Sequence, residues 1–262
     1  MFLSKIKLSK NLIKNKKRFQ GRLKGKITVR HRGSGVKKLY RKINLKENFK
    51  KKGLIVAVEY DPNRNNFLAK VLLKKNGQFV YDYILCKQNT NIFQTILPID
   101  DNLVPSENYN FGKTFLLKNL NIGDTISNIE KTPGKGAIFA RSAGCFGKII
   151  SLNEKRNLAR IQLPSGEQYY ISKNSKVTLG KMANIFHQYL KKWKAGTSRK
   201  LNVRPKVRGV AKNPIDHPHG GGEGKSSVGR PPVSPTGKLT KGVPTRNKRK
   251  NNFFIALRKT KK

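Results

Sequence analysis

The stretch FLAKVLLKKNGQFVYDYIL, residues 67–85, consists of two apolar runs on either side of Lys75-Asn76-Gly77. An Asn-Gly pair between two apolar runs is the strongest short-range signal for a β-hairpin. In the second run, 78–85, aromatic residues alternate with other side chains, and apolar groups fall on both faces of the expected strand. Such a strand is typical of a barrel near a covered surface. The stretch therefore predicts a hairpin in an all-β domain.

Similar short apolar runs, separated by turn residues, continue along the chain and extend the all-β prediction. The polar segment 98–113 contains prolines and a glycine, and we place a domain boundary close to Gly112. The runs beyond it are short and closely spaced, which suits a small barrel. One short helix is expected around 183–193. The further strands are expected at 54–60, 124–130, 136–142, 146–152, 157–163, 167–172 and 176–179.

Positive charge dominates the composition, with 58 Lys and Arg against 13 Asp and Glu and a net charge of +45. Residues 1–52 carry a net +19, residues 190–262 another +19, and the centre, 53–189, only +7. A free protein with this excess would repel itself, so a polyanionic partner is expected, and nucleic acid is the commonest. The arms should become ordered when that partner supplies the counter-charge. An anionic membrane surface is the rival, but no amphipathic helix with a clean apolar face is evident.

The two cysteines, Cys86 and Cys145, have no pattern of zinc ligands around them. We expect both to be small apolar residues in strands, in a reducing compartment. No apolar run reaches the roughly 18 residues that span a bilayer. The Lys-rich start is interpreted as a basic arm first and a targeting peptide second. Abundant Lys, Asn, Ile and Phe suggest an organelle-encoded or A/T-rich bacterial protein.

The segment NPIDHPHGGGEGKSS, residues 213–227, leaves four kinds of site open. Asp216, His217 and His219 could bind a metal ion, although a working site needs three or four ligands arranged in space. Gly224-Lys225-Ser226 resembles the end of a phosphate loop, but the required first glycine is replaced by His219. His217 beside Asp216 could serve catalysis, yet no nucleophile is implied.

Close packing of the backbone on RNA explains this segment best. Glycines at 220–222 let the chain approach phosphates and adopt backbone angles closed to other residues. His217 and His219 can donate hydrogen bonds to phosphate or 2′-hydroxyl groups, or stack on bases. This interpretation also accounts for the position of so polar a segment inside a basic tail.

The segment is also where the chain resembles a known family, the universal ribosomal large-subunit protein number two. The similarity runs from roughly residue 20 to the C-terminus, and five motifs occur in the family's order. They are RHRGSGVKKLYRKINLK (30–46), VEYDPNRN (58–65), TPGKGAIFARSAG (132–144), RPKVRGVAKNPIDHPHGGGEG (204–224) and GRPPVSPTGKLTKG (229–242).

The resemblance implies an all-β core with an OB-fold barrel followed by an SH3-like barrel. It implies a basic N-terminal arm at 1–52, the OB-fold RNA-binding domain at 53–112, the SH3-like barrel domain at 113–190 and an extended basic C-terminal tail at 191–262. The function implied is that of a structural constituent of the large ribosomal subunit, with its tail near the peptidyl transferase region. Assembly, subunit association and tRNA placement would depend on it, and the chemistry would belong to the RNA.

The implied partners are large-subunit rRNA, neighbouring ribosomal proteins and small-subunit rRNA at the subunit interface; no membrane, metal or cofactor is expected. No residue is expected to be catalytic, and His217 is the one to test. The alternative function is a metal-dependent or histidine-dependent enzyme that uses Asp216, His217 and His219. The residues expected to contact RNA are Arg30, His31, Arg32, Lys37, Lys38, Tyr40, Arg41, Arg64, Lys135, Arg141, Arg204, Lys206, Arg208, His217, His219, Gly220, Gly221, Gly222, Lys225, Arg230, Lys238, Lys241 and Arg246.

The chain departs from the family at three positions. Val36 replaces a usual histidine, Ser34 interrupts the early glycines, and Thr236 replaces a tryptophan of the late motif. A stacking indole is therefore missing at Thr236. The motif GRPPVSP is more similar to mitochondrial members of the family than to bacterial ones, which favours a mitochondrial ribosome. The bacterial cytoplasm is the alternative location.

Overall fold

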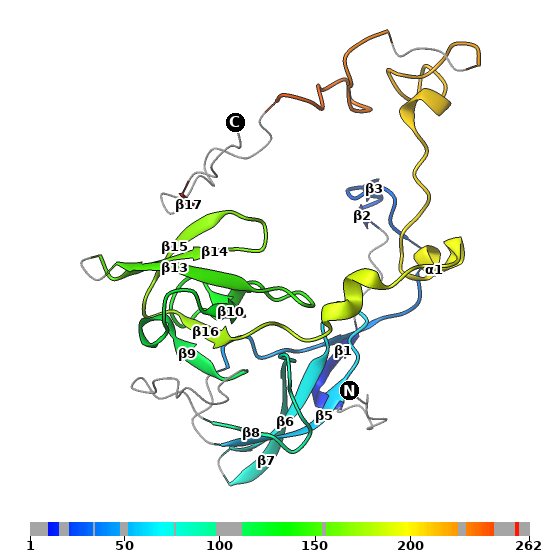
Figure 1. Cartoon of the computed structure of the whole chain (residues 1–262). Coiled ribbons are helices and arrows are strands. Elements are labelled where there is room, and N and C mark those ends of the chain that lie inside the picture. The colour runs from blue at the N-terminus through cyan, green and yellow to red at the C-terminus, as the bar shows by residue number, and fades with distance from the viewer. Residues whose placement is uncertain are drawn as a thin grey trace. The chain divides into compact units, whose positions relative to one another are not determined.

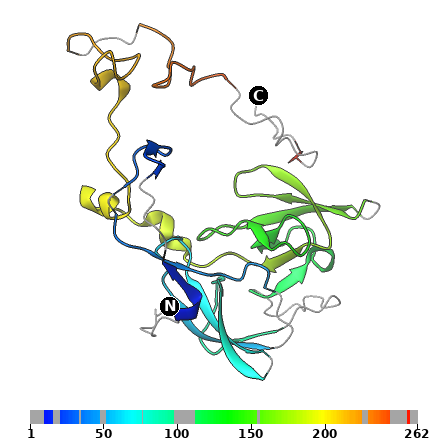
Figure 2. The same cartoon turned by 180° about the vertical axis from the view of Figure 1, so that it is seen from behind.

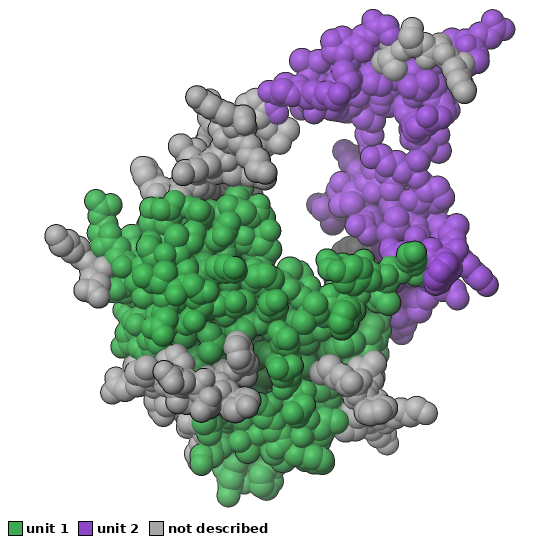
Figure 3. Space-filling view, viewed as in Figure 1, with its two compact units in different colours: residues 1–17, 38–191, 253–262 green, residues 18–37, 192–252 purple. Residues whose placement is uncertain are grey.

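The computed structural model divides into two compact units (Figure 3). The first comprises residues 1–17, 38–191 and 253–262, and the second comprises 18–37 and 192–252. Unit 1 is built largely of strands and turns, and the described part of unit 2 consists mostly of turns and irregular segments. The residues that the structure describes are 10–15, 21–33, 35–47, 52–75, 77–97, 112–153, 156–224, 229–243 and 255–256.

The first sheet of unit 1 contains the predicted hairpin and has the strand order β7-β6-β5-β8, all antiparallel (Figure 1). Lys75 pairs with Gln78, so the turn has two residues, and Gly77 has a φ of 82°. Asn76 lies outside the described residues. The hairpin prediction is confirmed. The strands are β5 (Gly53–Glu59), β6 (Leu68–Lys75), β7 (Gln78–Leu85) and β8 (Thr95–Ile96).

The second sheet of unit 1 has the order β17-β15-β14-β13-β10-β16-β9. Its interior is an aliphatic cluster around Ile126, Ile161 and Val177, all fully buried. The all-β prediction is confirmed, and the two sheets are consistent with an OB-like and an SH3-like domain. The strands are β9 (Thr114–Leu116), β10 (Thr125–Ser127), β13 (Gly147–Asn153), β14 (Leu158–Gln162), β15 (Gln168–Ser172), β16 (Lys176–Leu179) and β17 (Ile255–Ala256).

Backbone hydrogen bonds join the two sheets within unit 1, and both views show the sheets side by side (Figures 1 and 2). The Gln88 N–H donates to the Lys181 carbonyl at 2.9 Å, and the Ala183 N–H donates to the Cys86 carbonyl at 3.2 Å. The segment after β7 therefore runs along the segment after β16. This contact fixes one sheet against the other.

A buried polar network centred on Glu47 connects the same parts of unit 1. The Glu47 carboxylate accepts hydrogen bonds from the Lys87 ammonium, the Thr114 hydroxyl and the Asn128 amide, each at 2.9 Å. Glu47 is 4% exposed and Lys87 is 6% exposed. Buried charges are tolerated when they are paired and hydrogen-bonded, and this pair meets both conditions.

The early residues of unit 1 are part of the fold. β1 (Ile13–Asn15) pairs antiparallel with β4 (Leu39–Arg41), and β1 follows the 3-10 helix η1 (Lys10–Leu12). Leu12, Ile43 and Leu45 pack against buried side chains that include Tyr83 and Met182. The basic sequence before residue 52 thus contributes to a core as well as to charge.

Unit 2 combines a short N-terminal hairpin with the late part of the chain. The hairpin consists of β2 (Arg22–Leu23) and β3 (Lys26–Ile27), and the late part contains α1 (Ala195–Lys200) and η4 (Gly209–Ala211). The Gly33 N–H donates to the Asn202 carbonyl at 3.2 Å, and the Arg204 N–H donates to the His31 carbonyl at 3.0 Å. Residues far apart in the sequence therefore lie side by side in this unit.

The predicted helix at 183–193 is wrong in extent. The structure has a 3-10 helix, η3 (Ile185–Tyr189), and α1 as a separate helix. Asn184 is left-handed with a φ of 60°, and Leu190 is extended, so neither end continues the helix. Among the described residues no helix is long and apolar enough to cross a membrane.

Left-handed residues also shorten two predicted strands. The single strand expected at 124–130 is divided into β10 and β11 (Ile129–Glu130) by Asn128, whose φ is 50°. Asparagine adopts this conformation more readily than most residues, and here its amide is bonded to Glu47. The strand expected at 136–142 is only β12 (Ala137–Phe139), because Ala140 has a φ of 49°.

Two smaller expectations also need correction. Neither cysteine lies in a strand: Cys86 directly follows β7, and Cys145 lies two residues before β13. Cys86 is buried, and burial raises the pKa of its thiol to about 11. The turn end of β7 is not covered within the described structure, since Phe79 is 70% exposed. Within β7, only the side chains from Tyr83 to Leu85 are buried.

Candidate nucleic-acid interface

η4 and the segment that follows it fold into a compact loop held by its own backbone. The Asp216 N–H donates to the Asn213 carbonyl at 3.0 Å, and the Gly220 N–H donates to the His217 carbonyl at 2.8 Å. A β-carbon at Gly220 would lie 2.3 Å from the Asn213 carbonyl oxygen, so only glycine fits there. Residues 209–224 form the loop that we call the histidine loop.

His217 is buried inside this loop and is 8% exposed. Its ring packs on Gly209, where a β-carbon would lie 2.6 Å from the ring. Its Nδ1 accepts a hydrogen bond from the His219 N–H at 3.0 Å. The bond assigns the proton of neutral His217 to Nε2, which leaves this ring an N–H donor.

His219 connects the histidine loop to the next described segment of unit 2. Its Nε2 accepts a hydrogen bond from the Val233 N–H at 3.1 Å, and its ring centroid lies 4.8 Å from that of His217. Val233 pairs with Leu239 across a turn in which the Ser234 N–H donates to the Lys238 carbonyl at 2.8 Å. The two histidines therefore act as structural links between residues 209 and 239.

The electrostatics favour the neutral form of His217. Burial lowers the pKa of His217, and its electrostatic interactions with the neighbouring His219 and Lys212 lower it further. A neutral ring keeps its Nδ1 as an acceptor and preserves the bond to His219. No group of three or more His, Cys, Asp or Glu side chains is arranged to hold a metal within the described residues.

Cationic side chains in unit 2 are exposed on both sides of the histidine loop. Arg204, Lys206 and Arg208 precede it. Arg230, Lys238 and Lys241 follow it and are exposed as well. Lysines and arginines on loops neutralise phosphates. The glycines at 221 and 222, with φ values of 86° and 84°, have no side chains, so the backbone of the loop between these cations is narrow. The arrangement can follow a nucleic-acid backbone.

The predicted N-terminal residues join this surface of unit 2. Arg30, His31 and Arg32 are exposed, and His31 Nδ1 lies 3.1 Å from the Pro205 carbonyl oxygen. The unit thus brings residues 30–32 beside 203–205. Lys37 is exposed and Lys38 is half-buried.

Three predicted residues of unit 1, Tyr40, Arg41 and Arg64, make contacts within the protein. Arg64 forms a 2.6 Å ion pair with Asp61 and donates to the Tyr40 hydroxyl at 3.1 Å. Arg41 is buried and donates to the Leu39 carbonyl at 3.1 Å. These contacts stabilise the fold around β4, and a role of the three residues toward RNA stays a prediction.

The remaining predicted residues fall into two groups. Lys135 and Arg141 are exposed in unit 1, and Arg141 directly follows the left-handed Ala140. Lys225 and Arg246 lie outside the described residues.

The sequence interpretation missed Gly209, on which the His217 ring packs. Only the folded loop brings positions 209 and 217 together.

Two family models together match most of this chain. Residues 9–97 match "Ribosomal Proteins L2, RNA binding N-terminal domain", and residues 110–237 match "Ribosomal Proteins L2, C-terminal domain". The large ribosomal subunit protein uL2 of Wolbachia pipientis subsp. Culex pipiens (strain wPip) is 44% identical over 252 residues, covering 95% of this chain and 88% of the relative.

Two further relatives have the same identity. The large ribosomal subunit protein uL2m of Reclinomonas americana is 44% identical over 239 residues, covering 91% of this chain and 83% of the relative. The large ribosomal subunit protein uL2 of Orientia tsutsugamushi (strain Ikeda) is 44% identical over 236 residues, covering 90% of this chain and 83% of the relative. The residues that the two family models match include the first sheet, the second sheet except β17, and the histidine loop.

Proposed function

Because this chain belongs to the ribosomal protein L2 family, we propose that it is a structural constituent of the large ribosomal subunit that binds large-subunit rRNA. The observation that carries the proposal is the match of both family domains across a chain with a net charge of +45. A polyanion of the size of rRNA offers the counter-charge that such a chain needs.

The histidine loop is proposed to lie near the peptidyl transferase region. Its narrow, glycine-rich backbone suits a crowded RNA environment, and exposed cations flank it on both sides. Through this tail the protein supports assembly, subunit association and tRNA placement. Its partners beyond large-subunit rRNA are neighbouring ribosomal proteins and small-subunit rRNA at the subunit interface.

Residues 1–52 are proposed to form the basic arm, 53–112 the OB-fold domain, 113–190 the SH3-like domain and 191–262 the tail. The ribosome is proposed to be mitochondrial, on the wording of GRPPVSP at 229–235 and the A/T-type composition; the bacterial cytoplasm is the alternative.

Directed hydroxyl-radical probing tests the position of the tail. An iron chelate attached to an Ile215→Cys variant, at a side chain that is 94% exposed, should cleave rRNA around the peptidyl transferase region. Cys145→Ser removes the accessible native thiol, and Cys86 is buried. A chelate at Phe79→Cys, on β7, serves as the control and should cleave elsewhere. Cleavage from position 215 that is confined to other regions would contradict the proposed placement.

A His217→Ala variant distinguishes a structural role from the alternative enzymatic one. His217 seats the loop on Gly209 and bonds to His219, so its loss should lower the yield of assembled subunits. Peptide-bond formation by fully assembled variant ribosomes at saturating tRNA should remain near normal. A general base would instead contribute about 10²–10⁴-fold to the chemical step. A loss of about thousandfold in normally assembled particles would revive the catalytic role.

A further inference from the structure

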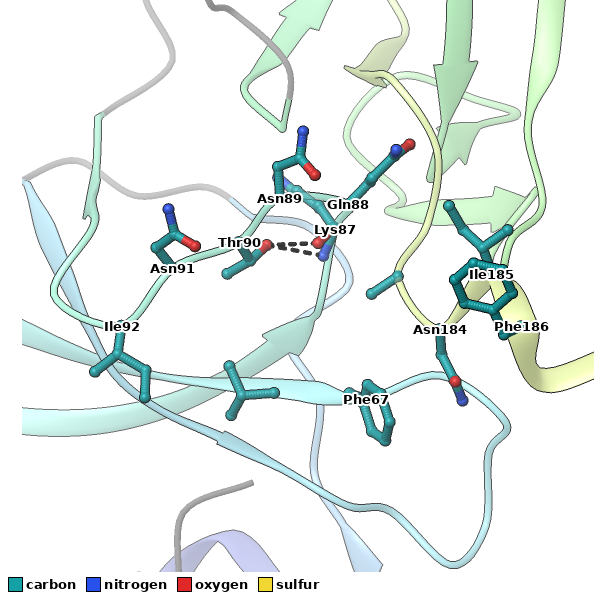
Figure 4. A pocket seen from close by; sticks show the side chains of 12 residues that line it. Phe67, Lys87, Gln88, Asn89, Thr90, Asn91, Ile92, Asn184, Ile185 and Phe186 are labelled. Atoms are coloured by element: carbon teal, nitrogen blue, oxygen red, sulfur yellow. Dashed lines mark hydrogen bonds between the residues drawn. The ribbon is translucent and has the colours of Figure 1, made fainter. Parts of the chain in front are cut away.

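A pocket in unit 1 is lined by residues that the candidate interface does not include, between the loop that follows β7 and the segment that enters η3 (Figure 4). Its volume is about 670 Å³, within the range of about 300–1,000 Å³ that small ligands occupy. Val58, Ala183 and the Phe67 ring form its apolar part. The Phe186 ring, which is 76% exposed, lies on the η3 side of the pocket (Figure 4).

Carboxamide side chains line the polar part of the pocket. Gln88, Asn89 and Asn91 come from the loop after β7, and Asn184 comes from the start of η3 (Figure 4). Within the described part of the chain, the side-chain amides of Gln88, Asn89 and Asn91 have no hydrogen-bond partner. Each amide offers a donor and an acceptor, and such groups match the edges of nucleobases.

The pocket has a single charged side chain among its described lining residues, in a chain whose net charge is +45. Lys87 is the one ionisable residue of that lining, and its ammonium is directed at Glu47, 2.9 Å away. A site for phosphate would need cations or backbone donors. An uncharged, flat group with polar edges fits this pocket better.

The walls of the pocket are held in place by hydrogen bonds. The Thr90 hydroxyl donates to the Lys87 carbonyl at 2.7 Å, and the Asn184 amide donates to the Asn65 carbonyl at 2.7 Å. Asn89 and Asn184 are both left-handed, with φ values of 58° and 60°. Hydrogen bonds within the protein thus support both walls, and a pre-organised site lowers the entropic cost of binding.

We propose that this pocket binds one unpaired nucleotide of large-subunit rRNA, with its base on the phenylalanine rings and its edge against the carboxamides. Proteins recognise single-stranded RNA by stacking exposed bases on aromatic rings and bonding their edges. The identity of the RNA rests on the proposed function; the base-binding character rests on the lining. A peptide segment of another ribosomal protein would use the same amides but has no need of the two rings.

Photo-crosslinking in assembled particles tests the proposal. Phe186 is replaced by p-benzoyl-L-phenylalanine in the full chain, large subunits are isolated and irradiated, and the product is mapped by primer extension. The expected product is a single unpaired nucleotide. Asn89→Gly removes one carboxamide without introducing backbone strain. It should lower the yield of the cross-link at least about fivefold, which corresponds to the loss of one hydrogen bond.

Two controls share the local chemistry. Asn157→Gly changes another exposed asparagine, with a φ of 50°, and should leave the yield unchanged. The same photoreactive residue at exposed Phe79 should give a product that does not respond to Asn89→Gly. A cross-link to a protein or to paired nucleotides, or a yield indifferent to Asn89→Gly, would overturn the inference. Absence of the chain from the particles would overturn the proposed function as well.

Discussion

Raising the monovalent salt from about 50 to about 200 mM should weaken the binding of this chain to large-subunit rRNA by about 10³–10⁵-fold. Each neutralised phosphate releases counterions, and each contributes a slope of roughly −0.7 to −0.9 in log K against log salt. Unit 2 alone exposes cations on both sides of the histidine loop, among them Arg204, Lys206 and Arg230. The predicted loss corresponds to about 6–10 phosphate contacts.

The measurement is a filter-binding or fluorescence titration of the full chain on rRNA over that range of salt. Lys206→Gln should reduce the slope by about one contact and weaken binding about equally for all RNA sequences. Glu223→Gln, at an exposed acid beside the loop, is the control and should not reduce the slope. A slope worth fewer than about three contacts would contradict an interface built on phosphate neutralisation.

A Glu47→Gln variant should lower the free energy of unfolding by about 3–5 kcal/mol. The substitution keeps the shape of the side chain but leaves the Lys87 ammonium buried without its counter-charge, 2.9 Å from the altered group. An unpaired buried charge costs far more than the loss of a surface ion pair. Lys87 and Thr114 lie on different sides of the junction between the two sheets. The substitution should therefore weaken the packing of one sheet against the other.

Urea unfolding of the purified full chain, followed by circular dichroism, measures this change. Glu223→Gln removes an exposed acid and is expected to change stability by less than about 0.5 kcal/mol. The double variant Glu47→Leu with Lys87→Met removes both charges and should recover much of the loss. A Glu47→Gln variant as stable as the Glu223→Gln control would show that the network does not hold the sheets together.

The elements that depend on neighbouring residues could be predicted from the sequence. The hairpin of β6 and β7 needs only the alternation of its residues and a two-residue turn at 76–77. The short strands β13 to β16 were likewise visible as apolar runs between turn residues. The family motifs extended this to the order of the two domains. The site residues that the motifs indicate stay a prediction, because the fold alone does not identify them.

The features that depend on distant residues could not be predicted. Glu47 is the single acid in a basic arm, and nothing local indicates that its partners lie at positions 87, 114 and 128. Asn128 interrupts a strand because its backbone is left-handed. Its side-chain amide donates a hydrogen bond to the same carboxylate. In the histidine loop, the proton position of His217 is assigned by the N–H of His219, which only the folded loop brings within reach.

Sedimentation of the chain with ribosomal particles tests the central claim most directly. A tagged full-length chain, expressed in cells of its source or in a related host, is followed through a sucrose gradient at low magnesium, where the subunits separate. We predict that it sediments with the large subunit, in about one copy per particle, and is released only at high salt. Recovery at the top of the gradient as a small soluble protein, with none on the large subunit at low salt, would contradict the account.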